Sequence, residues 1–319
     1  RGGGHNRTMA TVQATRAHAG GWVNSNMRYI DARLRPRPTP ITYLFTAPAP
    51  ETESSLLSRT GRCSMPHPGK VGKGGEDAHI ICSGSNGCTI SVVLDGVGGW
   101  SGVGIDSGLY SRTLARKIAL EFGLWADAQV ENGNRKQTHD QKPLLAILER
   151  AVAAVHGSQI PGSCTICMSM LFPDGKLHVL NLGDSGLRVV GKNHSISFAT
   201  HEQQHSFNYP KQLGIPSTDA PSDGDYSVID VCSGDIIVLG TDGVWDNLWE
   251  QEFLSLLFLA RTDRGSEERA ARMLVEAAQR KGGDRGYFSP FCAHARQAGI
   301  ANCLGGKLDD TTALVLRVP

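Results

Sequence analysis

Acidic residues at the ends of apolar runs are the first feature of this sequence that could do chemistry. Asp95 follows SVVL, Asp184 follows LNLG, Asp242 follows IVLGT, and Asp309 stands where the last apolar run begins. A carboxylate at the end of a buried strand is costly unless something compensates its charge. One such residue would be an ordinary turn or cap residue. Four placed alike, with the acidic pair at 76–77, predict convergence on one site.

The types of these side chains indicate which cation such a site would take. Clustered carboxylates repel and raise one another's pKa unless a cation holds them together. No matching set of His or Cys ligands lies near these runs, so the expected ion is magnesium or manganese rather than zinc. Gly96 fits this interpretation, because a residue without a Cβ lets its carbonyl approach an ion. The run DGVGG lacks the spacing of a dinucleotide-binding loop.

Two other groups of possible ligands are less informative. Cys164 and Cys167 have the C-x-x-C spacing of redox and zinc motifs, but they lie in a predicted strand. Residues three apart on a strand point to opposite faces, so we expect two separately packed thiols. His201 and His205 are four apart, yet the proline and turn residues around them argue against a helix that would pair them on a metal.

The elements that must position the acidic residues can be read from hydrophobic periodicity. Strands are predicted where short β-branched runs occur, at 90–96, 177–186, 235–243 and 308–318. Helical spacing is found at 109–122, 144–155, 245–257 and 270–280. Asp246 and Asn247 are expected to cap the third of these helices. Strands in groups with helices between them favour an α+β layered domain.

The first 58 residues differ in character from the rest. Up to residue 50 they carry seven arginines, no lysine and one acid, Asp31. An arginine-rich, acid-poor leader is typical of organellar transit segments, and an ordinary disordered tail has the same composition. A first strand is expected at 41–45. The predicted organisation is therefore a leader at 1–58 and one folded domain at 59–319.

Charge and hydropathy exclude two classes of protein. The 32 Lys and Arg residues nearly balance the 31 Asp and Glu residues, giving a formal net charge of +1. Such a chain has no strong field that would draw it to nucleic acid, so neither a nucleic-acid partner nor a two-metal nuclease is favoured. No stretch approaches the roughly 20 apolar residues of a spanning helix, and no membrane span is expected.

Taken in order, the acidic motifs resemble those of a known family. They are Glu76-Asp77, the DGVGGW run at 95–100, the GDSG run at 183–186, the TDGVWDN run at 241–247 and the DDTT run at 309–312. This order is similar to that of the metal-dependent serine/threonine protein phosphatases of the PPM, or type 2C, family, over roughly residues 70–318. The stretches 203–214 and 287–300 resemble the branch of the mitochondrial T-cell activation phosphatase. The resemblance and the leader together imply a mitochondrial protein, with the cytoplasm as the alternative.

The resemblance implies a four-layer αββα sandwich, in which two antiparallel sheets are flanked by helices and a dinuclear metal site lies at one edge. Two magnesium or manganese ions are expected, and a weak third ion is possible. The implied catalytic residues are Asp95, Asp242 and Asp309. The resemblance implies that Asp95 bridges both ions and that Gly96 binds one of them through its carbonyl. Asp242 and Asp309 would bind the other ion, and Glu76 and Asp77 would act through metal-bound water. Asp184, with Asp242, would hold the third ion.

The implied reaction is hydrolysis of phosphoserine and phosphothreonine in a phosphoprotein substrate, by in-line attack of a water or hydroxide that bridges the metals. The alternative is a catalytically silent binding module that keeps the fold. Two positions depart from the family pattern. Val97 replaces a histidine that many members have, and Gly72 replaces a phosphate-binding arginine. Lys70 and Lys73 are the expected substitutes for that arginine. The oligomeric state is not predicted.

Overall fold

The computed structural model of this chain describes residues 59–132, 141–260 and 265–319. The predicted leader at 1–58 and the predicted strand at 41–45 lie outside the described residues.

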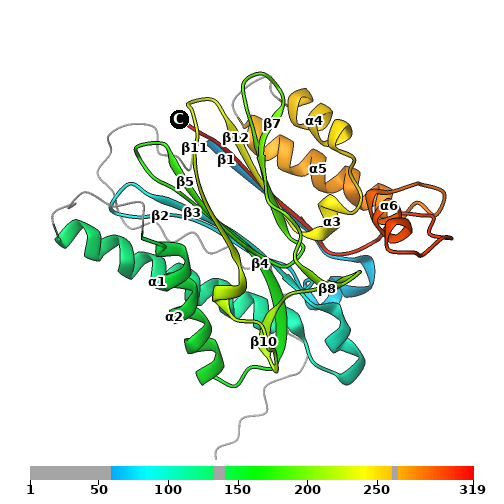
Figure 1. The fold of residues 1–319 in the computed structure, drawn as a ribbon, viewed down its shortest axis with the longest axis horizontal. Coiled ribbons are helices and arrows are strands. Elements are labelled where there is room, and N and C mark those ends of the chain that lie inside the picture. Colours follow the sequence, from blue (N-terminus) through cyan, green and yellow to red (C-terminus); the bar gives the residue numbers. More distant parts are fainter. Residues whose placement is uncertain (1–58, 133–140, 261–264) are drawn as a thin grey trace, which may run out of the picture. The chain divides into compact units, whose positions relative to one another are not determined.

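Two antiparallel sheets form the centre of the domain (Figure 1). The first sheet contains, in spatial order, β1 (Thr60–Met65), β13 (Thr311–Arg317), β12 (Ile236–Gly240), β6 (Gly186–Val190) and β7 (Ile196–Ala199). The second sheet contains β11 (Asp225–Asp230), β5 (Lys176–Leu182), β4 (Gly162–Leu171), β3 (Thr89–Gly96) and β2 (Ala78–Ser83), with β10 (Leu213–Ile215) paired to β4. A separate hairpin is formed by β8 (Gln204–Ser206) and β9 (Tyr209–Pro210).

Helices cover the outer face of each sheet. The long helices α1 (Ser107–Glu131) and α2 (Pro143–Gly157) pack on the second sheet, whereas α4 (Glu250–Leu259) and α5 (Ser266–Gly282) pack on the first. The shorter elements are α3 (Asp242–Trp245), α6 (Pro290–Gln297) and the 3-10 helices η2 (Pro68–Lys73), η3 (Gly98–Val103) and η4 (Pro221–Asp223). This is the αββα sandwich that the resemblance implies, and the predicted fold class is confirmed.

Strand alternation sorts the apolar residues into three layers, one between each pair of neighbouring layers of the sandwich. On β3, Ile90, Val92 and Leu94 pack against α1 and α2, while Val93 packs between the two sheets. Successive residues of a strand point to opposite faces. Asp95 therefore shares the face of Val93 and lies at the end of the space between the sheets.

The predicted helix at 245–257 is wrong in its extent, because the chain breaks between α3 and α4. Asn247 leaves the helical path: its side chain bonds to the carbonyl of Gly243 and to both backbone groups of Lys307. Trp249 is extended and starts α4, with its N–H donating to the Glu252 carboxylate. Neither Asp246 nor Asn247 caps α4, so that expectation is also wrong.

The C-x-x-C pair is resolved as two separate thiols. Cys164 packs with the helices on the outer face of β4, and Cys167 packs between the sheets. Both are free and buried, and burial raises the pKa of each thiol.

In the described part of the chain, none of the helices combines the length and the apolar composition needed to cross a bilayer.

Candidate metal centre

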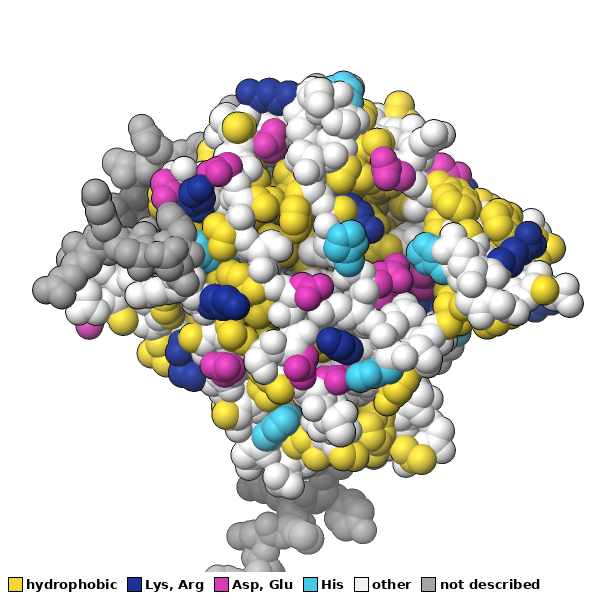
Figure 2. Space-filling model, viewed as in Figure 1, with side chains coloured by type: hydrophobic (Ala, Val, Ile, Leu, Met, Phe, Trp, Pro, Cys, Tyr) yellow, Lys and Arg dark blue, Asp and Glu magenta, His cyan; other side chains and the backbone are white. Residues whose placement is uncertain are grey.

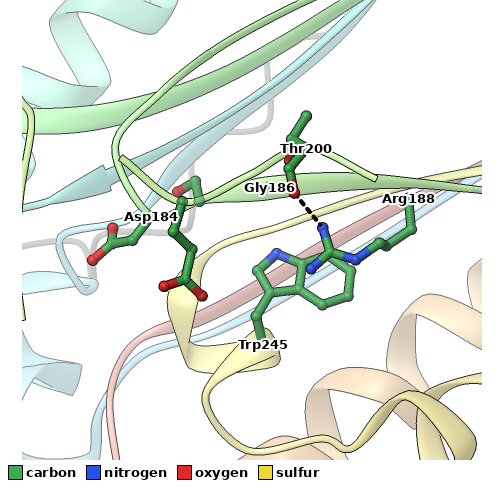
Figure 3. A pocket seen from close by; sticks show the side chains of 7 residues that line it. Asp184, Gly186, Arg188, Thr200 and Trp245 are labelled. Atoms are coloured by element: carbon green, nitrogen blue, oxygen red, sulfur yellow. Dashed lines mark hydrogen bonds between the residues drawn. The ribbon is translucent and has the colours of Figure 1, made fainter. Parts of the chain in front are cut away.

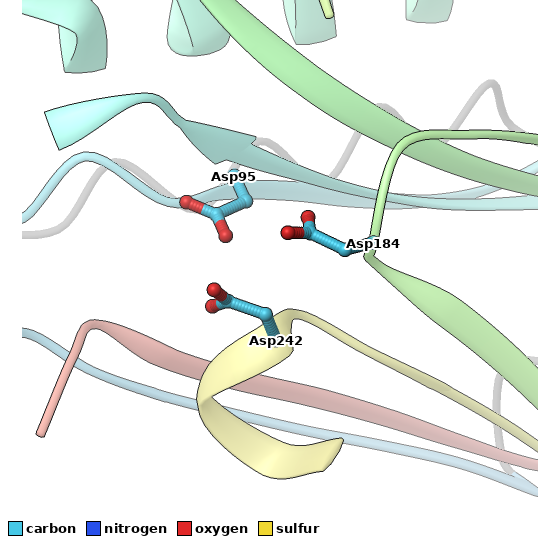
Figure 4. A group of neighbouring side chains, drawn as sticks. All are labelled: Asp95, Asp184 and Asp242. Carbon is cyan, nitrogen blue, oxygen red and sulfur yellow. The ribbon is translucent and has the colours of Figure 1, made fainter. Parts of the chain in front are cut away.

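Three aspartates from three separate segments meet at one end of the space between the sheets. Asp95 lies at the end of β3, Asp184 in the turn between β5 and β6, and Asp242 at the first residue of α3. One carboxylate oxygen of each lies within 4.8 Å of the others. The three side chains point toward one another (Figure 4). In the space-filling view, acidic side chains gather over α3, beside α6 (Figure 2).

The charges of this group oppose one another. Burial, and then the charges of Asp242 and Asp77, raises the pKa of Asp95 well above its ordinary value. Burial and Asp242 do the same to the pKa of Asp184. Asp242 differs: burial favours a higher pKa, but the neighbouring Lys307 ammonium outweighs it and the pKa is lowered. Carboxylates in this arrangement are expected to bind a cation.

Unsatisfied oxygens show that the group suits a hard divalent ion. Oδ1 of Asp77, Asp184 and Asp242 is buried and has no hydrogen-bond partner among the described residues. A buried carboxylate oxygen without a partner is unfavourable, and a coordinated cation would satisfy all three. The ligands available are oxygen atoms, which magnesium and manganese prefer. The residues present therefore fit the metal site implied by the sequence.

Asp77 is held by hydroxyl groups from the opposite sheet. Its Oδ2 accepts hydrogen bonds from Thr241 (2.9 Å) and Thr312 (2.7 Å), at the ends of β12 and β13 that face the site. Burial, followed by the charge of Asp310, raises the pKa of Asp77 well above its ordinary value. The two hydroxyls fix one oxygen and leave Oδ1 free to face the site.

Asp310 joins the last motif to the first. Its Oδ1 accepts from the backbone N–H of His67 (2.6 Å) and its Oδ2 from that of Glu76 (2.8 Å). Asp310 is 2% exposed. This carboxylate therefore fixes the loop that carries Glu76 and Asp77, across more than 230 residues of sequence.

The two lysines predicted to bind phosphate are placed differently. The Nζ of Lys70 lies 2.7 Å from Glu76, 3.3 Å from Asp309 and 3.2 Å from Asp310. Burial alone would lower the pKa of Lys70, but these carboxylates raise it above its ordinary value. Lys73, at the end of η2, is exposed. The structure therefore brings Lys70 into the site and leaves Lys73 at the surface.

Gly96 is required by close packing of the backbone. A Cβ at this position would lie 2.6 Å from the carbonyl oxygen of Glu76 and 3.0 Å from its Cβ. Because real side chains do not tolerate such contacts, glycine lets the end of β3 approach Glu76. This approach brings the Glu76-Asp77 loop next to Asp95.

Asp309 lies beside the group of three aspartates and is held by two lysines. Its carboxylate oxygens are 3.3 Å from Lys70 and 3.6 Å from Lys307. Its backbone carbonyl accepts a 2.6 Å hydrogen bond from Gln279 on α5. Burial and the charge of Asp242 raise the pKa of Asp309.

Several residues of the site were missed by sequence reasoning. They are Thr241, Thr312 and Asp310, which hold the acidic loop, and Lys307 and Asp246, which form an ion pair at 2.9 Å. Strand alternation could have found Thr241 and Thr312, because they share the parity of inward-facing leucines. A lysine two residues before Asp309 was visible in GGKLDDTT, but nothing local indicates which acids it meets.

A shallow pocket next to Asp184 is filled by internal contacts. It is lined by Asp184, Ser185, Gly186, Arg188, Thr200, Glu202 and Trp245. Figure 3 shows the Arg188 guanidinium stacked on the Trp245 indole, 4.7 Å from the ring centroid. Arg188 also donates to the carbonyls of Leu187 and Thr200. Trp245 is therefore a packing residue. His205 pairs with Asp219 at 2.9 Å, outside the aspartate group.

Comparison with known proteins agrees with this geometry. The sequence profile of the protein phosphatase 2C family matches residues 69–278. "Probable protein phosphatase 2C 80" of Arabidopsis thaliana is 38% identical over 270 residues, covering 83% of this chain and 60% of that protein. The chain thus spans about three fifths of the length of this relative.

Solved structures show the same fold. "X-ray structure of the photosystem II phosphatase PBCP" is 29% identical, with a TM-score of 0.69 over 82% of this chain and 98% of the other. The catalytic domain of the phosphatase PstP, in complex with two manganese ions, is 16% identical, with a TM-score of 0.54 over 82% of this chain and 98% of the other. This chain belongs to the protein phosphatase 2C family.

Proposed function

We propose that this chain is a magnesium- or manganese-dependent protein phosphatase that hydrolyses phosphoserine and phosphothreonine. The observation that carries the proposal is the meeting of Asp95, Asp184 and Asp242 within 4.8 Å in a fold of the 2C family. A phosphoprotein is the corresponding substrate. All three proteins reported in the comparison are phosphatases by name.

The residues that would hold two metal ions are those of the acidic group and its rim. They are Asp95, Asp242 and Asp309 as main ligands, Gly96 through its carbonyl, Glu76 and Asp77 through water, and Asp184 toward a third ion. When bound, such ions make water a stronger nucleophile and neutralise charge on phosphoryl oxygens. The chain's own contribution is to fix these oxygens from both sheets, through Thr241, Thr312 and Asp310.

Lys70 is the best candidate for binding the phosphate. Its ammonium reaches the same carboxylates that would hold the metals and its side chain remains 25% exposed. As a point charge, lysine can attract a phosphoryl oxygen without the two-pronged geometry of arginine. Lys73 has no such placement. Val97 offers no proton, so the alcohol that leaves must be protonated by water or by another group.

Substrate choice is proposed to depend on the hairpin β8–β9. The N–H of Gln203 donates to the carbonyl of Gly183, directly before Asp184, at 2.9 Å. Phe207, at the turn of the hairpin, packs on Phe291 of α6 with ring centroids 5.1 Å apart. The hairpin therefore lies beside the metal centre, where a peptide around the phosphorylated residue would contact it.

The direct test is hydrolysis of p-nitrophenyl phosphate and of a phosphothreonine peptide, in EDTA and then with magnesium or manganese. Activity should require one of the metals. It should fall by about 1,000-fold or more in Asp242→Asn, since removal of a ligand to a catalytic ion removes several kcal/mol of transition-state stabilisation. Asp230→Asn, a surface aspartate of β11 paired with Lys176, is the matched control and should keep full activity.

The silent binding module is the alternative that this experiment addresses. A folded chain that binds manganese but turns over neither substrate would be a binding protein with a phosphatase fold. The unpartnered oxygens of Asp77, Asp184 and Asp242 favour the enzyme, because a silent module has no need to retain buried, mutually repelling carboxylates.

The destination in the cell is a separate proposal. The arginine-rich composition of residues 1–50 and the resemblance of 203–214 and 287–300 to the mitochondrial T-cell branch support a mitochondrial protein. The photosystem II phosphatase among the structural neighbours makes the plastid the competing destination. Fusion of residues 1–58 to a fluorescent protein would separate mitochondrial, plastid and cytoplasmic distributions.

A further inference from the structure

Lys307 is a charged side chain inside the acidic centre for which the phosphatase reaction has no assigned use. Its Nζ forms ion pairs with Asp242, with Asp246 at 2.9 Å and with Asp309 at 3.6 Å. Two of these acids are expected metal ligands. The Lys307 side chain is 18% exposed, so water contributes little to its solvation and the carboxylates must do so.

The backbone of Lys307 is fixed as firmly as its ammonium. Asn247 Oδ1 accepts from the N–H of Lys307 at 2.9 Å, and Asn247 Nδ2 donates to its carbonyl at 2.7 Å. The same amide donates to the carbonyl of Gly243, one residue after Asp242. Asn247 thus ties the Lys307 segment to the start of α3, and the ring of Phe291 lies 5.6 Å from the ammonium.

Asp246 gives Lys307 a partner that is not an expected metal ligand. Its side chain is 13% exposed, and it is the C-terminal cap of α3. An ammonium paired with Asp246 can therefore remain in the centre whether or not Asp242 and Asp309 bind a metal. A positive charge held at this place opposes the approach of a divalent cation.

We propose that Lys307 is a resident counter-ion of the Asp242 and Asp309 carboxylates and that it sets the concentration of divalent metal at which the centre fills. Ammonium and metal share two carboxylates, so each weakens the binding of the other. Lys307 therefore stabilises the metal-free chain and lowers its metal affinity. This inference rests on the proposed function, because it takes the acidic group to be a metal site.

The test is Lys307→Met, which keeps the length of the side chain and removes its charge. Manganese binding is measured by electron paramagnetic resonance of the free ion, and thermal melting is measured with and without EDTA. The dissociation constant for manganese should fall by about tenfold or more, because a nearby like charge is removed. In EDTA the melting temperature should drop by roughly 10 °C, since carboxylates lose their buried partner. Saturating manganese should restore it to near the wild-type value.

Lys281→Met is the matched control. Lys281 also pairs with a carboxylate, Glu252 at 2.6 Å, and lies over a ring, Tyr287 at 3.9 Å, but its partners are not in the acidic group. It should leave manganese binding unchanged. Lys307→Gln, which keeps a hydrogen-bond donor without charge, should behave like Lys307→Met and provides a second variant if the methionine variant does not fold in EDTA.

Each outcome decides a different question. Unchanged or weaker manganese binding in both Lys307 variants would overturn the proposal. A raised KM for the phosphothreonine peptide in Lys307→Met, with unchanged manganese binding, would also overturn the proposal. That result would instead assign Lys307 to binding the phosphate of the substrate. If the wild-type chain binds neither manganese nor magnesium, the proposed function itself fails. If the wild-type chain binds manganese and hydrolyses phosphothreonine while Lys307→Met binds the ion no more tightly, only this inference fails.

Discussion

The space between the two sheets is apolar in its middle and acidic at one end, although the same strands line both regions. On each of three strands, the last apolar residue of the middle and the first polar residue of the end are two positions apart. These pairs are Val93 and Asp95 on β3, Leu239 and Thr241 at β12, and Leu314 and Thr312 on β13. A step of two keeps a side chain on the same face of its strand.

This difference shows how the fold separates stability from function. The apolar middle removes surface from water and holds the sheets together. The acidic end is carried by the same strands, so its side chains are positioned as accurately as those of the apolar middle. At this end, however, the fold tolerates buried carboxylates with raised pKa values. The acidic centre therefore lowers the stability of the fold, and the neighbouring apolar core offsets that loss.

The largest effect is expected where the acidic chemistry is moved into the apolar region. Val93→Asp would place a carboxylate at a position that is 0% exposed, in the apolar cluster that contains Cys167 and Leu314, and without a cation. The free energy of unfolding should fall by more than about 4 kcal/mol, measured by urea denaturation followed by circular dichroism. Val93→Ala is the control for lost packing and should cost about 2 kcal/mol. Equal effects of the two variants would mean that the middle tolerates charge and that the contrast is not real.

A smaller effect is expected where a polar residue at the end of the space is made apolar. Thr312→Val preserves shape but removes the hydroxyl that donates to Asp77 Oδ2 at 2.7 Å. Metal-dependent activity should fall by about 10- to 100-fold, the usual effect of a lost partner behind a metal ligand. The assay is manganese-dependent hydrolysis of a phosphothreonine peptide. Thr312→Ser retains the hydroxyl and should keep most of the activity; a loss as large as that of valine would instead implicate packing of the methyl group.

The acidic end should also be a source of instability without metal. Asp95→Asn removes one of the repelling carboxylates, whose pKa is raised by burial, Asp242 and Asp77. In EDTA at pH 7 the variant should be more stable than the wild type by about 1–2 kcal/mol. Saturating manganese should reverse the order, because only the wild type gains strongly from ion binding. If Asp95→Asn is the less stable chain in EDTA, the carboxylate group supports the fold by itself and the comparison of the two regions must be revised.

The sequence was sufficient for features that depend on local pattern. Short β-branched runs predicted strands, and the resemblance of the ordered acidic motifs to the 2C family implied the sandwich. The grouping of Asp95, Asp184 and Asp242 followed from the same ends of strands. Their carboxylates do lie together in the structure.

Features that depend on distant partners were not predictable. Lys307 meets Asp242 across 65 residues, and Asp310 meets His67 across 243. The break of the helix at 246–249 has the same cause, since Asn247 bonds to Lys307, 60 residues further on. Lys70 and Lys73 could not be separated by type or spacing, because only the direction of the η2 turn decides which of them faces the acids.

The smallest effect is expected at an ion pair on the outer side of the first sheet, where the sign of the pH dependence is opposite to that of the acidic centre. Glu267 Oε1 accepts from Arg317 Nε at 2.6 Å. Burial favours a raised pKa for Glu267, but the hydrogen bond and charge of Arg317 lower it overall.

A lowered pKa in the folded chain means that this pair stabilises the fold above the unfolded pKa of Glu267. The stabilisation is lost as the pH falls from that value through the folded pKa. Glu267→Gln should therefore lower the free energy of unfolding by about 1 kcal/mol at pH 7. The difference from the wild type should shrink toward zero as urea titrations approach about pH 4 and below. A difference that stays constant with pH would show that Glu267 acts through its hydrogen bonds and not its charge. In that case the Glu267–Arg317 pair would not share in the dependence of stability on carboxylate charge that is expected at the acidic end of the space between the sheets.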